Sequence, residues 1–392
     1  MYPRISDLLN DLLGTNIILP VQTYGFFVAM AFVAAGSILY LELKRKERNG
    51  TIKSRTKKVL AGKPPSLNEY ITTALLYFAI GYKIIGLLLN YGEVAEQPQE
   101  YLLSWKGNFL AGVLLAALAV YLVYRKGKKE KLDKPVVKEE EIHPYQLTPA
   151  IVLVAAFAGI FGAKMFDVVE HLDDFFRDPL GTLFSFSGLT FYGGLIVAAF
   201  AVSWYGEKNN IRWPVMADAV APALMLAYAV GRIGCQLSGD GCWGVPNPHP
   251  QPEWLGFLPN WTWSFTYPHN VINEGVPMPG CDGNFCHELA QPVWPTPFYE
   301  TTICTIFFFV LWGIRKSIAI PGVLFSIYLI LNGIERFFIE FIRVNIQYTI
   351  LGIRMTQAQA IAILIVVVGI AGIFWFRYRY HQRKKLHHES TT

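Results

Sequence analysis

The residues best suited to chemistry stand in one glycine-rich stretch, Gly231 to Gly244, which directly follows a long apolar run. Its polar and sulfur-containing side chains are Arg232, Cys235, Gln236, Ser238, Asp240 and Cys242. An arginine at the end of a spanning run is costly unless it has a partner or a function, and glycines let the backbone approach a ligand closely. The stretch therefore favours a site for an anionic headgroup, whose phosphate an arginine binds well. A snorkelling arginine before a glycine-rich loop is the alternative.

A second polar pattern lies at the end of another apolar run. Its members are spaced i, i+4, i+8 and i+11, and they are Asn332, Arg336, Glu340 and Arg343. On a helix this spacing places all four side chains on one face. A polar stripe inside a spanning helix indicates a functional site by default. The alternative is an ion pair between Arg336 and Glu340 that only holds helices together.

Polar side chains also mark the ends of further apolar runs, namely Tyr24, Lys164, Tyr192 and Glu300. Interfacial anchoring is the usual role of a tyrosine such as Tyr24. Lys164 and Asp167 are three residues apart and share a helical face, so they can neutralise one another.

The elements that position these residues are apolar runs of membrane-spanning length. The chain has 392 residues, of which 53% are hydrophobic, and a helix needs about 20 apolar residues to cross a bilayer. The apolar runs cover residues 18–41, 71–91, 108–124, 147–167, 190–206, 214–231, 298–314, 321–342 and 356–376. Because only helices or closed barrels satisfy the backbone in lipid, we expect an all-α polytopic integral membrane protein with about nine transmembrane helices.

Lysine and arginine residues concentrate in alternate loops. The loops after the first, third, fifth, seventh and ninth runs are basic, with Lys63, Lys131 and Lys134 among them, whereas residues 245–297 contain neither lysine nor arginine. The positive-inside rule therefore places the N-terminus outside and the C-terminus in the cytoplasm. The basic runs recur on one side only, so they do not indicate nucleic-acid binding.

We expect six parts in the chain. They are an outer-surface amphipathic segment (1–20), a first helix with a first repeat copy as scaffold (21–146), a second repeat copy with the glycine-rich stretch (147–244), an extracytoplasmic cap (245–297), C-terminal transmembrane helices (298–376) and a basic cytoplasmic tail (377–392). The repeat has an offset of about 80 residues. Residues 78–83 resemble 158–164, and residues 107–112 resemble 188–194. Chance similarity between glycine-rich membrane helices is the alternative.

Four of the five cysteines lie in or beside the segment expected outside the cytoplasm, where disulfides persist. Cys281 and Cys286 close a short loop and are the predicted pair. A zinc site there is a weaker interpretation, because His287 alone does not complete a ligand set. The state of Cys235 and Cys242 stays open.

The topology, which rests on loop charges alone, brings most of the candidates to one side of the membrane. Those expected at the outer ends of their helices are Tyr24, Tyr192, Arg232, Asp240, Glu300, Arg336, Glu340 and Arg343. Arginines and acids ringed at the outer leaflet and open to lipid are typical of a site for an anionic lipid headgroup.

These motifs, taken in order, resemble those of the phosphatidylglycerol–prolipoprotein diacylglyceryl transferase family. The matching elements are Tyr24-Gly25, Gly162 to Lys164, Phe191 to Gly194, Ala217 to Pro222, Gly231 to Gly244, Tyr299-Glu300 and Asn332 to Arg343. The resemblance covers most of the chain. Departures from the family pattern are Cys235 and Ser238 in place of two asparagines, Asp240 in place of a glutamate, and Tyr192 in place of a histidine.

The resemblance implies transfer of a diacylglyceryl group from phosphatidylglycerol to the lipobox cysteine of a prolipoprotein signal peptide. A thioether forms, glycerol phosphate leaves, and the chemistry requires no metal or organic cofactor. The setting is the bacterial inner membrane, with the site at the outer leaflet.

The resemblance also implies roles for individual residues. The expected catalytic residues are Arg232, Asp240, Arg336, Glu340 and Tyr192. The expected substrate-binding residues are Tyr24, Cys235, Ser238, Gly244, Asn332, Arg343, Glu300 and Lys164. A lipid or small-anion transporter and a non-catalytic relative are the alternatives.

Overall fold

The computed structural model describes the chain except residues 18, 20, 62–63, 90–100, 102–103, 131–135, 185–189, 351 and 390–392. The loop lysines Lys63, Lys131 and Lys134 and the start of the second repeat motif, residues 188–189, lie outside the described residues. The chain divides into two compact units. One contains Met1, residues 24–55 and residues 143–392, and the other contains residues 2–23 and 56–142.

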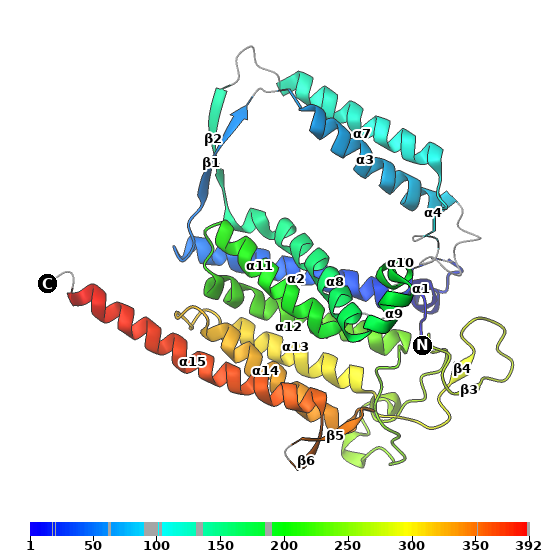
Figure 1. The fold of residues 1–392 in the computed structure, drawn as a ribbon. Coiled ribbons are helices and arrows are strands. Elements are labelled where there is room, and N and C mark those ends of the chain that lie inside the picture. Colours follow the sequence, from blue (N-terminus) through cyan, green and yellow to red (C-terminus); the bar gives the residue numbers. More distant parts are fainter. Residues whose placement is uncertain are drawn as a thin grey trace. The chain divides into compact units, whose positions relative to one another are not determined.

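The larger unit is a set of long helices that run side by side (Figure 1). They are α2 (Thr23–Arg48), α8 (Thr148–Glu170), α11 (Phe191–Lys208), α12 (Trp213–Ser238), α13 (Thr296–Ile314), α14 (Val323–Ile339) and α15 (Gln357–Glu389). A proline in the first turn starts α8, α12 and α13, where its missing N–H costs nothing. The closest helix pairs are α8 with α11, α12 with α13, and α14 with α15.

Smaller elements complete this unit. They are η2 (Pro144–Leu147), α9 (Leu172–Arg177), α10 (Pro179–Phe184), η3 (Glu253–Leu255), η4 (Asn260–Thr262), β3 (Val276–Pro277), β4 (His287–Glu288), η5 (Glu340–Ile342), β5 (Gln347–Ile350) and β6 (Ile353–Thr356). β3 pairs with β4 and β5 pairs with β6, both antiparallel.

Helices long and apolar enough to cross a membrane occur in both units. Six are found among the described residues: α2, α12, α13, residues 144–170, residues 109–129 and residues 357–382. The outward faces of these helices expose large apolar side chains, such as Phe157 of α8 and Phe309 of α13. The prediction of a mainly helical, polytopic membrane protein is therefore confirmed.

The three other predicted spans are also helical, but shorter or interrupted. The run 71–91 is divided into α3 (Leu67–Ile80), a π-helical turn η1 (Gly81–Ile85) and α4 (Gly86–Leu89). α11 has 18 residues and α14 has 17.

The smaller unit contains a helical hairpin and a two-stranded ribbon. α3, η1 and α4 pack against α7 (Phe109–Glu130), and β1 (Arg55–Ala61) pairs with β2 (Val136–Ile142). α1 (Ile5–Leu13) begins this unit. The Lys83 ammonium donates to the carbonyl oxygens of Tyr101 at 3.0 Å and Lys106 at 2.8 Å, so it closes the loop of the hairpin.

The two predicted repeat copies pack their hairpins in the same way. A Cβ added to Gly81 would lie 2.6 Å from the carbonyl oxygen of Ala111 and 2.9 Å from Gly112 Cα. A Cβ added to Gly162 of α8 would lie 2.5 Å from the carbonyl oxygen of Gly193 in α11. In both hairpins a glycine therefore lets two helix backbones touch.

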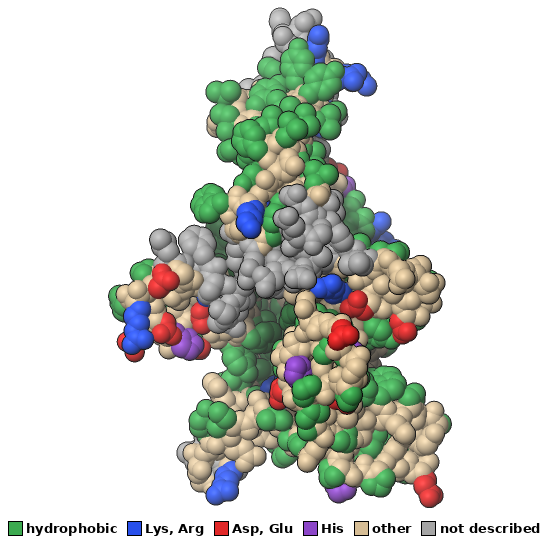
Figure 2. All heavy atoms as spheres, turned by 90° about the vertical axis from the view of Figure 1, so that its right-hand side faces the viewer, with side chains coloured by type: hydrophobic (Ala, Val, Ile, Leu, Met, Phe, Trp, Pro, Cys, Tyr) green, Lys and Arg blue, Asp and Glu red, His purple; other side chains and the backbone are tan. Residues whose placement is uncertain are grey.

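Residues 239–295 connect α12 to α13, and we call them the α12–α13 segment. Its small core contains Trp243, Tyr267, Leu289 and Val293. The predicted disulfide between Cys281 and Cys286 is present, with a Cα–Cα distance of 5.6 Å. Figure 2 looks onto this end of the larger unit, where charged side chains cover only a small part of the lower half of the view.

The same end of the larger unit gathers many helix termini. α2, α11 and α13 begin there, and α8, α12 and α14 end there (Figure 1). The candidate residues near those termini therefore share one end of the helix set.

The close contact at Gly162 generates a stability prediction. We expect Gly162→Ala to lower the free energy of unfolding by about 1–3 kcal/mol, because the new methyl group overpacks against backbone. Gly159→Ala, one turn away on α8, is the matched control, because its Cβ would meet other atoms only at 3.9 Å or more. Equilibrium unfolding in mixed detergent micelles measures both, and equal stabilities would contradict the contact.

Candidate functional site

A buried carboxylate, Glu300 in the first turns of α13, is the centre of the site. Its side chain is completely buried, and three arginines surround it. Arg232 of α12 forms an ion pair with Oε2, Arg343 Nη1 lies 3.0 Å from Oε1, and Arg336 Nη1 lies 4.0 Å from Oε1. A buried charge is tolerated only when it is paired, so this carboxylate ties three segments of chain together.

A second acid, Glu340, holds one of these arginines from the other side. Arg336 Nη2 lies 2.7 Å from Glu340 Oε2, and Asn345 Nδ2 donates to Glu340 Oε1 at 2.5 Å. The predicted i, i+4 ion pair is therefore present. The other terminal nitrogen of Arg336, Nη1, is buried and has no hydrogen-bond partner in the part of the chain that the structure describes.

The predicted helical face over residues 332–343 is wrong at its C-terminal end. α14 ends at Ile339, Glu340–Ile342 form a single 3-10 turn, and Arg343 is extended. Arg343 reaches Glu300 because its backbone pairs with Gly244, while the Val245 N–H donates to the Ile342 carbonyl oxygen at 2.8 Å.

Gly244 makes this pairing possible. A Cβ at this position would lie 2.3 Å from the Ile342 carbonyl oxygen and 2.9 Å from side-chain atoms of Thr296 and Trp294. The Gly244 N–H donates to the Trp294 carbonyl oxygen at 2.9 Å. Glycine therefore lets the segment after α12 lie between the end of α14 and the start of α13.

Arg232 lies near the end of α12 with its guanidinium 5.2 Å from the centroid of the Tyr228 ring. Its Nη1 is 3.8 Å from Cys235 Sγ, and 17% of its side chain is exposed. Gly234 allows α2 to approach, since a Cβ there would lie 2.9 Å from Phe27 Cβ. Tyr24 at the start of α2 interacts electrostatically with Arg232. It also interacts with Cys235, Asp240 and Cys242.

Two thiols and a carboxylate lie together beside Arg232. The ligand atoms of Cys235, Asp240 and Cys242 are within 4.8 Å of one another. The chain reverses between them at Gly239 and Gly241, whose φ angles are 65° and 87°. Both cysteines are free thiols, and the Cys242 N–H donates to Asp240 Oδ1 at 3.3 Å.

The electrostatics of this group lower the pKa of the Cys242 thiol. The Cys235 thiol donates a hydrogen bond to Cys242, and this bond lowers the pKa of the Cys242 thiol. The positive charges of Arg232 and Arg343 lower the same pKa, whereas burial and Asp240 oppose them.

The other predicted residues lie on neighbouring elements. Ser238 is fully buried in the last turn of α12, and its carbonyl oxygen accepts from the Val271 N–H at 3.1 Å. Asn332 is half-buried on α14. Lys164 pairs with Asp167 at 3.0 Å on α8, and Tyr192 lies at the start of α11 with its ring edge-to-face against Phe191.

Sequence reasoning did not assign Glu335, which the structure places within the arginine cluster. Glu335 is 2% exposed, and its two carboxyl oxygens have no hydrogen-bond partner among the described residues. It interacts electrostatically with Glu300, Arg232, Arg336 and Arg343. An acid inside an apolar run was the available signal.

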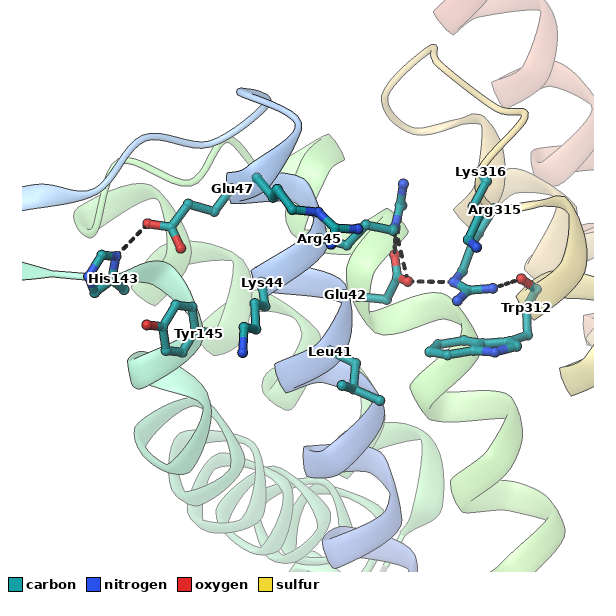
Figure 3. A pocket seen from close by; sticks show the side chains of 11 residues that line it. Leu41, Glu42, Lys44, Arg45, Glu47, His143, Tyr145, Trp312, Arg315 and Lys316 are labelled. Atoms are coloured by element: carbon teal, nitrogen blue, oxygen red, sulfur yellow. Dashed lines mark hydrogen bonds and ion pairs between the residues drawn. The ribbon is translucent and has the colours of Figure 1, made fainter.

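A pocket of about 640 Å³ lies at the opposite end of α13 (Figure 3). Glu42 is fully buried there between Arg45, at 2.8 Å, and Arg315, at 2.6 Å. The Arg315 guanidinium also stacks on the Trp312 ring at 3.3 Å, and His143 pairs with Glu47 at 2.7 Å. These groups satisfy one another and join α2 to α13, so we place the functional site at the Glu300 end.

Comparison with known proteins agrees with the motifs. A family model described as prolipoprotein diacylglyceryl transferase matches residues 109–375. Similar proteins named phosphatidylglycerol–prolipoprotein diacylglyceryl transferase occur in Leptospira interrogans (26% identical, covering 62% of this chain and 73% of the relative) and Clostridium tetani (29%, covering 60% and 79%). Another occurs in Dehalococcoides mccartyi (27%, covering 69% and 88%). α2, with Tyr24, precedes the matched residues.

The shared carboxylate generates a prediction for a double-mutant cycle. We expect Glu300→Gln to destabilise the protein by about 3–5 kcal/mol, because it leaves buried arginines without a counter-charge. The double variant Glu300→Gln/Arg343→Gln should lose less free energy of unfolding than the sum of the two single losses, by about 1–3 kcal/mol. Unfolding in mixed micelles measures the cycle.

The control for this cycle is Glu300→Gln with Arg315→Gln. Residues 300 and 315 lie about 22 Å apart along α13, so their effects should add within about 0.5 kcal/mol. Strict additivity of the Glu300 and Arg343 changes would contradict a shared ion pair.

Proposed function

The chain belongs to the prolipoprotein diacylglyceryl transferase family, and on that premise we propose that it transfers the diacylglyceryl group of phosphatidylglycerol to a cysteine thiol of a prolipoprotein. The observation that carries the proposal is the convergence of Arg232, Arg336 and Arg343 on one buried carboxylate. Such preplaced cations suit a reaction in which a phosphate leaves.

The reaction converts a thiol and a phosphodiester into a thioether and a phosphate monoester. The sulfur forms a bond to the terminal glycerol carbon of the diacylglyceryl group. The bond from that carbon to the phosphate oxygen breaks, and its electron pair stays on the phosphate. Glycerol phosphate therefore gains negative charge in the transition state, where fixed cations stabilise it most.

We assign phosphate binding to Arg232 and Arg336. Both are partly exposed, at 17% and 24% of their side chains, and Arg336 Nη1 has a proton to donate. Glu340 holds Arg336 in place, and Arg343 with Glu300 fixes the cluster. A guanidinium bound by an acid on one edge presents its other edge to the phosphate without further reorganisation.

The remaining assignments rest on position around this cluster. Asp240 orients the loop after α12 or accepts the thiol proton, and Tyr24 and Tyr192 position substrate. Five residues at motif positions of the family complete the expected binding set: Cys235, Ser238, Gly244, Asn332 and Lys164. The acceptor is the lipobox cysteine at the end of a signal peptide.

We further propose a topology of about nine transmembrane helices in the bacterial inner membrane. The N-terminus is extracytoplasmic, the C-terminus is cytoplasmic, and residues 245–297 form an extracytoplasmic cap over the site. The lack of lysine and arginine in residues 245–297 and the basic loops at the other helix ends support this orientation. Apart from Tyr24, residues 21–146 act as scaffold, and the other active parts follow residue 147. The transporter alternative has no support among the related proteins.

The phosphate-binding assignment is tested with the full-length protein, phosphatidylglycerol and a lipobox peptide. We expect Arg336→Gln to lower kcat for thioether formation at least about 100-fold, because one transition-state donor is lost. Mass spectrometry detects the diacylglyceryl group on the cysteine. Arg315→Gln, which removes an arginine that is also paired with a buried acid, at the other end of α13, should keep more than half the activity, and equal losses in both variants would contradict the assignment.

The orientation is tested by labelling in intact spheroplasts. Glu253 and Lys316 are both exposed and lie at opposite ends of the helix set. We expect a membrane-impermeant maleimide to label Glu253→Cys and not Lys316→Cys, each compared with the parent protein. Labelling of Lys316→Cys and not of Glu253→Cys would contradict the proposed orientation and indicate the opposite one.

A further inference from the structure

Cys235, Asp240 and Cys242 form a compact group of metal-ligand atoms at the edge of the arginine cluster. Their two sulfur atoms and carboxylate oxygen lie within 4.8 Å of one another. In a tetrahedral zinc site with zinc–sulfur bonds of about 2.3 Å, two sulfur ligands stand about 3.8 Å apart. Shifts of about 1 Å or less in each ligand atom, by rotation of its side chain, would bring the three atoms to zinc-binding distances.

We propose that these three residues bind a zinc ion with one open coordination position. Two thiolates favour zinc over magnesium or calcium, which prefer oxygen ligands throughout. Three protein ligands with a fourth position left open are typical of catalytic rather than structural zinc. The open position takes the thiol of the prolipoprotein cysteine, so the proposal rests on the proposed transferase function.

The surroundings hold the ligands in place. The Cys242 N–H donates to Asp240 Oδ1 at 3.3 Å, which orients the carboxylate. Thr296 Oγ1 donates to the Cys242 carbonyl oxygen at 2.6 Å and ties the backbone of this ligand to the start of α13. Gly239 and Gly241 have positive φ angles and turn the chain, so that Cys242, which follows α12, faces Cys235 in the last turn of that helix.

The nearby arginine is compatible with a cation here. Arg232 Nη1 lies 3.8 Å from Cys235 Sγ. Two thiolates, one carboxylate and a divalent ion carry one net negative charge, and the Arg232 guanidinium balances it. Cys242 and Asp240 are half-buried, so a substrate thiol can reach the ion, whereas Cys235 is buried.

The zinc ion supplies the thiolate that the reaction needs. A thiol that coordinates zinc loses its proton to solvent, so a protein base is not required. The bound sulfur forms the carbon–sulfur bond, the carbon–oxygen bond to phosphate breaks, and glycerol phosphate leaves beside Arg232 and Arg336 with the electron pair. The neutral thioether is a weaker ligand than a thiolate and dissociates. This proposal replaces the expectation of a metal-free reaction and gives Cys235 a role that the family's asparagine cannot have.

Metal content of the full-length protein in detergent tests the site. After equilibration with zinc chloride and removal of free metal, we expect one zinc per chain by mass spectrometry. Cys235→Ser and Cys242→Ser should bind zinc at least about tenfold more weakly. Cys304→Ser, which removes a buried free cysteine of α13, is the matched control and should keep the full zinc content. Equal zinc retention in the Cys235→Ser/Cys242→Ser double variant would overturn the site. Maleimide labelling of chelator-treated protein is a second check. If Cys235 and Cys242 react only after reduction, they form a disulfide, which would also overturn the site.

Cobalt substitution tests the role of the open position. Cobalt chloride in place of zinc should give a thiolate-to-cobalt charge-transfer absorption, which a lipobox peptide with cysteine intensifies and the same peptide with serine does not. An unchanged spectrum at saturating cysteine peptide would overturn thiol coordination.

Activity separates this proposal from the transferase function. Zinc-free protein that transfers the diacylglyceryl group at the full rate would overturn the metal's role and leave the transferase standing. Zinc-loaded protein that binds the cysteine peptide through cobalt or zinc yet never forms the thioether would support the metal site and overturn the transferase function.

Discussion

The fold around the site depends on one interaction, the pairing of the buried Glu300 carboxylate with three arginines. Each of these arginines would be costly at the end of a membrane-spanning helix without a counter-charge. The carboxylate is completely buried, so it is equally costly without the arginines. Neither side is stable alone, and α12, α13 and the chain after α14 must therefore meet at this point.

Small residues make that meeting possible. Gly244 lets the segment after α12 lie against the carbonyl oxygen of Ile342, which brings Arg343 to the carboxylate. Gly234 lets α2 pack closely against the last turns of α12, which brings Tyr24 beside Arg232. A larger side chain at either position would separate the elements, and the ion pairs would then lengthen with them.

Local spacing predicted part of this arrangement. The ion pair between Arg336 and Glu340 follows from i, i+4 geometry, and the disulfide follows from two cysteines separated by a short loop. The apolar runs predicted where the helices lie, and the charge pattern predicted which helix ends share a side. These features depend on neighbours in sequence or on composition, so the sequence contains them directly.

The remaining features depend on contacts between distant segments. Glu300 was expected only to bind substrate, because nothing near it in sequence shows that three arginines share it. Arg343 was placed on a helical face that ends four residues earlier, because helix termination here comes from pairing with Gly244. Cys235 and Cys242 come together through two residues with positive φ angles, which spacing does not specify.

The two ends of α13 show why buried ion pairs alone do not identify a site. Glu42 and Glu300 are both fully buried acids held by more than one arginine. At Glu42, the guanidinium of Arg315 is used by the acid, a backbone carbonyl and the Trp312 ring. At Glu300, the buried Arg336 Nη1 has no hydrogen-bond partner among the described residues, and two thiols and an acid lie beside Arg232. The arginine contacts at Glu42 serve to join helices. At Glu300, by contrast, the Nη1 group of Arg336 is available to the anionic substrate that we propose.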